Sequence, residues 1–515
     1  MRVAPLLAKL AALAITSAAC TALFDPSSTQ CTVDADCVRF GGHPYCRAGV
    51  CVASGLGPAS CFAGAPSQQD DFLNRCSTAQ CFPFDDCHRV DVCGNAASLD
   101  AALIPPPGPE ASTSGPGAPE ASDAPAGGAA DAASADVEAG LTTDGGAPLP
   151  RCVDGAQGRG QVVVLSGSSN FPPLLAKLAP LVVAAGYTPV YQVTSSCAGV
   201  AAMLGTARTL VDPAPGSSGK PAEYFQSDGT AVPCALGPGG LPVDVGESDI
   251  FSSSCSGYGP PAGDVAEYLG PVQAILFVAP GASSQQVISA AAAREVFGMG
   301  APGGIGAPWT DPALYFVRNQ NTGTQQMIAK AIAVPPSAFW GVDRGTAAAV
   351  DADLRVISDP ATADKAIGII SADYYDADRA NLRALAFKAE GQGCGYLPDS
   401  TPFNRDKANV RDGHYPIWGP IHFFARVQNG IPSSPAAAAF VSIVSVPNLP
   451  KELLDAFIAS SLVPDCAMTV QRKSELGPVT PYAPPFGCGC YFGASVGDAP
   501  PAQCAKCATA GDCTD

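Results

Sequence analysis

Short apolar runs of strand length alternate with segments of helical period between residues 161 and 463. The run at 161–167 (QVVVLSG) has the pattern of a buried strand, and 172–186 repeats its apolar residues at helical spacing. Further strands are expected at 188–193, 271–280, 313–319, 365–371 and 421–427, and further helices at 284–298, 323–332, 451–463 and from residue 200 onward. This alternation predicts an α/β fold with parallel sheets.

The predicted main domain is long enough to divide in two. It covers residues 152–480, and a stretch of this length exceeds what one hydrophobic core normally organises. We expect one lobe (lobe I) to comprise 155–270 and 425–475, and the other (lobe II) to comprise 271–424.

The flanking segments differ sharply in composition. Residues 31–93 hold nine cysteines, which predicts a disulfide-rich module over 21–99 rather than a large apolar core. Residues 100–151 are mainly Ala, Pro, Gly, Ser and acidic residues without periodicity, which predicts a disordered linker that holds the main domain away from a membrane. A second Cys-rich tail is expected over 481–515.

The first 20 residues have the pattern of a bacterial export signal. Arg2 and Lys9 are its only charges, the apolar stretch around them is too short to span a bilayer, and small residues follow it directly before Cys20. A Cys in this position resembles the lipobox, in which it becomes the acylated N-terminus. We therefore expect a protein held in the cell envelope by a lipid on Cys20; the alternative is cleavage near Ala19 and release.

The cysteine count agrees with export and lipidation. The chain has 21 cysteines, and an even number remains for disulfides once Cys20 is set aside. Cys152 is a candidate tenth partner for the N-terminal module, and Cys234 is a candidate partner of Cys197 or Cys255. Zinc at Cys504-x2-Cys507 is the alternative interpretation of the tail, and the four scattered histidines argue against a metal site.

Charge and motifs exclude several functions. The net charge of −18 argues against nucleic acid as a partner and does not attract anions from a distance. The chain lacks the P-loop pattern, and its one G-x-S-x-G match at 493–497 has neither a preceding apolar strand nor a following His. No cofactor, catalytic residue or metal is therefore expected.

Three predicted strand-to-helix junctions carry small polar residues. They lie at 168–173, 195–199 and 318–324, and each places Ser, Thr, Asn or Gly where a helix begins. A helix N-terminus offers free backbone N–H groups and a partial positive charge. Three such ends that converge at the carboxyl ends of strands would form an oxyanion site without bulk positive charge.

The order of several short sequences identifies a family resemblance. GSSNFPPLL, YQVTSSCAGV, VDVGESD, VRNQNTGT and KAIGII follow one another as in the phosphate-binding subunits of ABC importers, over about 320 residues. The resemblance implies a two-lobed periplasmic-binding-protein fold of type II and a phosphate site between the lobes. The site residues that it implies are Asn170, Phe171, Ser196, Asp249, Arg318, Thr322, Gly323 and Thr324.

The chemistry of these residues suits a protonated oxyanion. Arg318 offers a planar fork to two oxygens, and Ser196, Thr322 and Thr324 offer hydroxyls and backbone N–H groups. The carboxylate of Asp249 only accepts, so it favours hydrogen phosphate over fully ionised sulfate. Where the family has Thr and Asp, this chain has Asn170 and Gln320, and Gln320 removes a negative partner of Arg318.

Three functions are compatible with the sequence. The first is capture of inorganic phosphate or a similar oxyanion, with an ABC permease as the implied partner. The second is an interaction or adhesion scaffold that keeps the lobes without a ligand, which the flanking Cys-rich segments favour. The third, a phosphatase, lacks a metal cluster and an activated nucleophile. An insertion at about 205–240 would change ligand size if it covered the cleft, and Pro416 suits a hinge.

Overall fold

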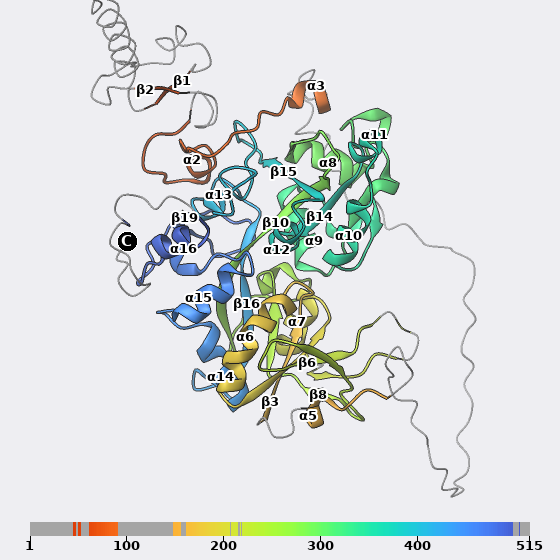
Figure 1. The fold of residues 1–515 in the computed structure, drawn as a ribbon, viewed down its shortest axis with the longest axis vertical. Helices are drawn as coiled ribbons and strands as arrows, with labels where there is room; N and C mark the ends of the chain where they lie inside the picture. Colours follow the sequence, from red (N-terminus) through yellow and green to blue (C-terminus); the bar gives the residue numbers. More distant parts are fainter. Residues whose placement is uncertain are drawn as a thin grey trace, which may run out of the picture.

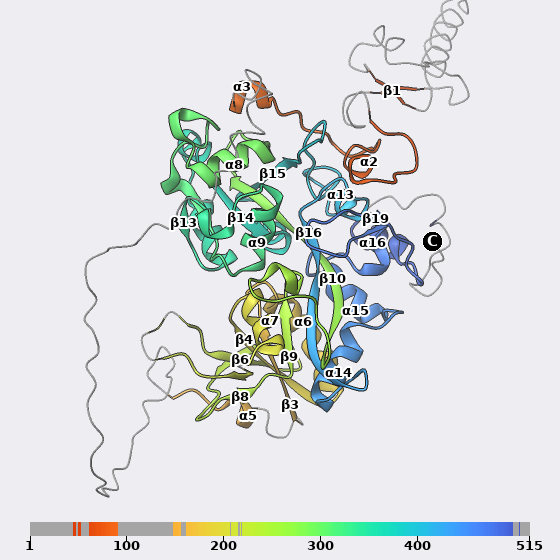
Figure 2. The same cartoon turned by 180° about the vertical axis from the view of Figure 1, so that it is seen from behind.

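The computed structural model describes residues 45–47, 50–52, 61–90, 148–155, 161–206, 208–214, 217, 219–497 and 504. Two lobes, each a sheet flanked by helices, are joined by two long strands, as Figures 1 and 2 show. The two-lobed α/β fold expected from the sequence is thereby confirmed. The predicted signal, the lipidation site Cys20, most of the acidic linker and Cys507 lie outside the described residues.

Lobe I is built on strands that are buried on both faces. Val163 and Leu165 pack under the helices α6, α14 and α15, while Val164 faces the opposite side, so the whole apolar run is covered. β3 runs parallel to both β4 and β9. The elements are β3 (Gln161–Gly167), β4 (Tyr187–Val193), β9 (Val245–Ser248), α6 (Pro172–Ala184), α7 (Ser196–Leu204), β17 (Ile431–Pro432), α14 (Pro435–Val444) and α15 (Lys451–Ile458).

The long strands β10 (Val265–Pro280) and β16 (Trp418–Gln428) connect the lobes. They are antiparallel, and their register shifts between Leu269 and Val272. The first part of β10 pairs with β16 in lobe I, whereas its last part pairs with β14 and β15 in lobe II. The expected parallel pairs are present, but the sheets are mixed, because β10 and β16 run antiparallel to each other and to their neighbours β9, β14 and β15.

Lobe II repeats the layered arrangement around the second half of β10. β12 is parallel to β14, and β11 is parallel to β15. Residues 287–289, expected to be helical, form a strand before the helix begins. The elements are β11 (Val287–Ser289), α8 (Ala290–Met299), β12 (Tyr315–Val317), α9 (Gly323–Ala331), β13 (Val342–Asp343), α10 (Ala347–Arg355), α11 (Pro360–Ala363), β14 (Ile367–Ser371), α12 (Ala372–Ala377), β15 (Leu382–Lys388) and α13 (Ala408–Arg411).

The insertion at 205–240 widens the lobe I sheet. β6 pairs with the outer edge of β4 and β7 pairs with β6, so the described part of the insertion lies along that sheet edge. Its cysteine, Cys234, is bonded to Cys152, and Cys197 is bonded to Cys255, which corrects both pairings considered from the sequence. The elements are α5 (Cys152–Gly155), β5 (Thr209–Leu210), β6 (Ala222–Phe225), β7 (Ala231–Cys234) and β8 (Leu241–Pro242).

Part of the N-terminal Cys-rich region packs on lobe II. After the β1–β2 pair (Tyr45–Arg47 and Val50–Val52), residues 61–90 carry α2 (Gln69–Leu73) and α3 (Asp86–Val90), and α3 lies beside α8 in Figure 1. The Cys81–Cys394 disulfide and the Lys388–Asp86 ion pair attach this segment, which also holds the Cys61–Cys76 disulfide. The segment shares the main core through Phe72, which the sequence did not indicate.

The C-terminal segment contacts both lobes away from the β3–α6 side. Its disulfides are Cys466–Cys488 and Cys490–Cys504. The Tyr491 hydroxyl bonds to Asp455 on α15, and the Arg411 guanidinium stacks over Phe492. The elements are β18 (Val470–Gln471), β19 (Thr480–Pro481) and α16 (Gly489–Ser495).

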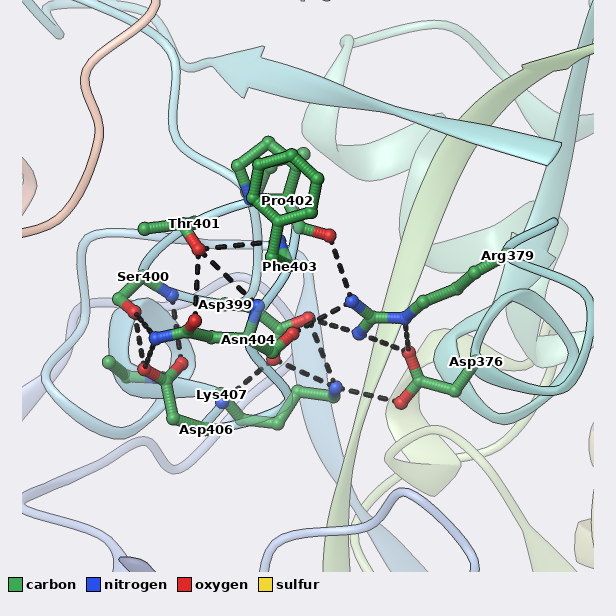
Figure 3. Close-up of polar contacts among 12 residues, drawn as sticks. Asp376, Arg379, Asp399, Ser400, Thr401, Pro402, Phe403, Asn404, Asp406 and Lys407 are labelled. Atoms are coloured by element: carbon green, nitrogen blue, oxygen red, sulfur yellow. Dashed lines mark hydrogen bonds and ion pairs between the residues drawn. The ribbon is translucent and has the colours of Figure 1, made fainter. Parts of the chain in front are cut away.

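A buried ion cluster holds the loop before α13 in lobe II. Figure 3 shows Lys407 between Asp376 and Asp399, at 2.8 and 2.9 Å, while Arg379 bonds to the same two carboxylates. Two cations and two anions neutralise each other, which is the arrangement that makes burial of charge tolerable. The cluster fixes the exposed turn that carries Phe403.

The described residues contain neither a membrane-spanning helix nor a metal-binding cluster. None of their helices has both the length and the apolar character needed to cross a membrane. Their His, Cys, Asp and Glu side chains form no group of three or more that could hold a metal ion.

Candidate functional site

Three helix N-termini meet between the lobes. α6 and α7 begin where β3 and β4 end in lobe I, and α9 begins after β12 in lobe II. Ser195 caps α7 by accepting from the Ala198 N–H at 3.1 Å, and Thr322 caps α9 by accepting from the Gln325 N–H at 3.4 Å. The predicted convergence of the junctions at 168–173, 195–199 and 318–324 is therefore present in the structure.

Asp249 is the centre of the polar contacts in lobe I. It is almost fully buried, and one of its carboxylate oxygens accepts from Ser168 Oγ, from Asn170 Nδ2 at 3.0 Å and from Ser196 Oγ at 3.4 Å. Burial raises the pKa of Asp249, while hydrogen bonds and the Arg318 charge oppose that rise. Burial of the negative charge of Asp249 is thus unfavourable, and a hydrogen-bond donor on a ligand would reduce this desolvation cost.

A second buried carboxylate, Glu247, lies behind Asp249. It accepts from the Ser168 N–H at 2.7 Å and from the Tyr191 hydroxyl at 2.9 Å. Burial and the nearby Asp249 charge hold the pKa of Glu247 well above its ordinary value. Burial therefore opposes a negative charge on Glu247, and the two hydrogen bonds that it accepts oppose this effect in part.

Arg318 is the buried cation of the site. Its Nε donates to the Gly345 carbonyl at 3.2 Å and its Nη2 donates to Ser169 Oγ of lobe I at 2.9 Å. Within the described part of the chain its Nη1 has no hydrogen-bond partner. Burial lowers the pKa of Arg318 while the Asp249 charge raises it, and a guanidinium remains charged in proteins. A buried, unpaired N–H next to an acceptor is suited to an oxyanion.

The two lobes touch through the remaining site residues. The Gly323 N–H donates to Ser196 Oγ at 3.0 Å, and Asn170 Nδ2 donates to Thr324 Oγ1 at 3.3 Å. Both contacts link α9 of lobe II to the junctions of lobe I. The structure therefore shows the lobes closed on each other at the predicted site.

Two predicted residues have other roles. The Phe171 side chain is in the lobe I core, where its ring lies 5.5 Å from the rings of Tyr191 and Phe423, so it does not offer a group to the cluster. Thr322 Oγ1 donates to the Asn319 carbonyl at 2.8 Å and caps α9, so it positions the helix end. Gln320 is exposed.

Several site residues were not singled out from the sequence. Ser168 and Ser169 belong to the junction predicted at 168–173 but were not among the predicted ligand-binding residues, and Glu247 was not considered at all; all three contact residues of the site directly. Asp373, at the start of α12, is also part of the electrostatic environment: loss of hydration, with a smaller contribution from the Asp249 charge, raises its pKa to about 6. Apart from Arg318, the charged groups gathered at this point are the carboxyls of Glu247, Asp249 and Asp373.

The chain was compared with known proteins. No family model matches it, and no curated protein matches it. Among solved structures it is similar to a candidate phosphate ABC transporter substrate-binding protein from Clostridium perfringens with bound phosphate, at 12% identity and a TM-score of 0.39 over 59% of this chain and 99% of the other.

Two further structures illustrate the range of similar proteins. An ABC-type phosphate transport receptor from Vibrio cholerae has 11% identity and a TM-score of 0.37, over 59% of this chain and all of the other. A Synechocystis CcmR regulatory domain in complex with 2-PG has 10% identity and a TM-score of 0.30, over 55% and 96%.

Proposed function

We propose that the protein is an extracytoplasmic solute-binding protein that captures hydrogen phosphate, or a related protonated oxyanion, between its lobes. The observation that carries the proposal is the buried Arg318–Asp249 arrangement, in which Nη1 of Arg318 has no partner among the described residues. A cationic donor and an anionic acceptor in one cluster match a ligand that both accepts and donates hydrogen bonds.

A proton on the ligand that is donated in a hydrogen bond to Asp249 would select hydrogen phosphate over sulfate. Hydrogen phosphate can donate to the Asp249 carboxylate, whereas fully ionised sulfate can only accept. Sulfate would require a protonated Asp249, and near neutral pH that protonation costs free energy even though burial raises the pKa of this residue. A mismatch of this kind leaves a charged acceptor unpaired, which costs about 1–3 kcal/mol or more.

Ligand entry and closure would use the hinge strands. β10 continues from the sheet of lobe I into the sheet of lobe II, and β16 pairs along its first part, so a rotation about these strands would separate α9 from α7 without breaking either sheet. Gly323, Thr324 and Arg318 would then close over the ligand from lobe II. The proposal includes a lipid anchor on Cys20, a location in the cell envelope and a permease as recipient.

Calorimetric titration of the full, disulfide-bonded chain freed of ligand tests the proposal. We expect phosphate to release heat near pH 7 with sulfate inactive at equal concentration. Arg318→Met should weaken phosphate binding roughly 10- to 100-fold, the range for a lost charge-assisted hydrogen bond. Arg344→Met is the matched control, because Arg344 pairs with Asp353 in lobe II.

A ligand-free scaffold is the second candidate function. Gly323 bonds to Ser196 and Asn170 bonds to Thr324 directly, so closure is satisfied without a ligand. If a folded, ligand-free sample gives neither heat nor a thermal shift with phosphate, the binding proposal fails and the scaffold is favoured.

A further inference from the structure

A second pocket lies at the hinge, away from the Asp249 cluster. It has a volume of about 360 Å³, within the range of roughly 300–1,000 Å³ usual for small-molecule sites. β10 around its register shift, the start of β16, the segment before α15 and the C-terminal segment all contribute to its wall. We call it the hinge pocket; its apolar residues include Leu269, Val272, Pro447, Phe457, Met468 and Phe486.

Arg472 places a buried cation in this apolar wall. Its guanidinium carbon lies 3.9 Å from the ring centroid of Trp418, and its Nη1 donates to the carbonyls of Pro416 and Trp418 at 3.0 and 3.3 Å. The residue is 8% exposed, yet within the described part of the chain it forms no ion pair. A cation this deeply buried normally has an anionic partner.

Two donors of the hinge pocket have no partner. Nε of Arg472 and Nε1 of Trp418 are buried, and neither has a hydrogen-bond acceptor among the described residues. Both residues line the pocket. Because buried N–H groups are almost always paired, two orphaned donors in one wall indicate an acceptor that is supplied from outside the chain.

The nearby carboxylates do not contact Arg472 directly. Burial lowers the pKa of Arg472, and the charge of the buried Glu475 opposes that shift. Glu475 nevertheless forms no ion pair with Arg472 within the described residues, and it accepts instead from the Phe251 N–H at 3.2 Å. Asp465 is exposed and accepts from the Tyr482 hydroxyl at 2.5 Å. The hinge pocket therefore has a positive charge at its buried end, on Arg472, and a negative charge at its exposed end, on Asp465.

We propose that the hinge pocket binds a small aliphatic carboxylate, with the carboxylate on Arg472 and Trp418 and the hydrocarbon chain against the apolar wall. A guanidinium and an indole N–H supply directed donors to the carboxylate oxygens. Burial of the chain against Leu269, Met468 and Phe486 supplies the hydrophobic contribution. The site is independent of the proposed oxyanion function, since Trp418 and Pro420 line the hinge pocket whereas their neighbour Gly419 approaches the Asp249 backbone.

Titration of the full chain with decanoate, below its micellar concentration, tests the proposal by calorimetry and tryptophan fluorescence. We expect one equivalent of decanoate to bind, decanol to bind at least 10-fold more weakly, and decyltrimethylammonium not to bind. Arg472→Gln should reduce the decanoate affinity at least 10-fold.

If Arg472→Gln fails to fold, a variant at the exposed edge of the hinge pocket tests the same proposal. Phe486 is half exposed, so Phe486→Glu should fold and repel the carboxylate, which reduces affinity at least 10-fold. Phe403→Glu, at a 93% exposed site in lobe II, should bind as the native chain does. Absence of decanoate binding, equal affinity for decanol, or unchanged binding by Phe486→Glu would each overturn the proposal.

Discussion

The backbone N–H of Gly323 donates to the Ser196 hydroxyl across the two lobes, at 3.0 Å. The approach is close enough that a Cβ on Gly323 would lie 2.5 Å from Cβ of Asp249 and 2.7 Å from Ser196 Oγ. The start of α9 therefore reaches the acidic centre of lobe I only because residue 323 lacks a side chain.

The first prediction concerns this contact. Gly323→Ala should hold the lobes apart, because the added methyl group overlaps Asp249, and it should weaken phosphate binding roughly 5- to 100-fold, as overpacking by about 1–3 kcal/mol requires. Small-angle scattering should show a larger radius of gyration. Gly259→Ala is the control, since nothing lies within 4 Å of the Cβ at that position. An unchanged radius and affinity in Gly323→Ala would contradict the closed arrangement.

The second prediction concerns anion selectivity. Asp249→Asn replaces an anionic acceptor by a neutral group that can also donate, so the variant should bind sulfate detectably and lose part of its affinity for phosphate. Competition calorimetry with both anions near pH 7 measures the change. Continued exclusion of sulfate by the variant would show that Asp249 does not set selectivity.

The third prediction concerns the pH dependence of stability. Burial is the main cause that raises the pKa of Glu475 to about 7, from an ordinary value of 4.5. A carboxyl with a raised pKa binds its proton more tightly in the folded state, so it lowers the free energy of unfolding as the pH rises from about 4.5 to 7. In Glu475→Gln, the free energy of unfolding should therefore fall less over this pH range, by up to about 3 kcal/mol.

Urea unfolding of the native chain and Glu475→Gln at pH 5 and pH 8 measures this difference. The variant should have the larger advantage at pH 8, where the native carboxylate is ionised and buried. Glu452→Gln is the control, because Glu452 is exposed in the first turn of α15. Equal pH slopes for the native chain and Glu475→Gln would contradict the expected burial cost.

The fourth prediction concerns the ion cluster in Figure 3. Lys407→Met leaves Asp376 and Asp399 with only Arg379 as a cation, so stability should fall by about 3–5 kcal/mol, the usual effect of breaking a buried pair. Thermal unfolding of the oxidised chain measures it. Lys365→Met, at an exposed position, should leave the melting temperature unchanged.

Local sequence patterns predicted the lobes well because their strands are continuous apolar runs. The strand at 161–167 and the helix at 323–332 were found at their observed places within a residue or two. The strand at 287–289 was missed, because three residues that pair with β15 merge into the apolar pattern of the helix that follows. Nothing local reveals that a short strand has a partner 100 residues away.

The sequence predicted the site residues near the helix N-termini but not the buried carboxyl group behind them. Ser196, Asp249 and Arg318 follow from junction chemistry and family resemblance, and the structure brings them together. Phe171 has the right place in the sequence, yet its ring points into the core, since side-chain direction depends on the packing of β3 against α6. Glu247 was missed because alternation along β9 turns it inward, toward Tyr191.

The Cys81–Cys394 bond also determines what a protease can do to this molecule. It joins Cys81, in the segment that ends at residue 90, to lobe II, while Cys152 further along the chain is bonded to Cys234 in lobe I. A single cut anywhere between these positions would leave both fragments in one covalent unit. The nicked protein would migrate as an intact chain until a reductant separated it, and whatever holds the N-terminal end would still hold both lobes.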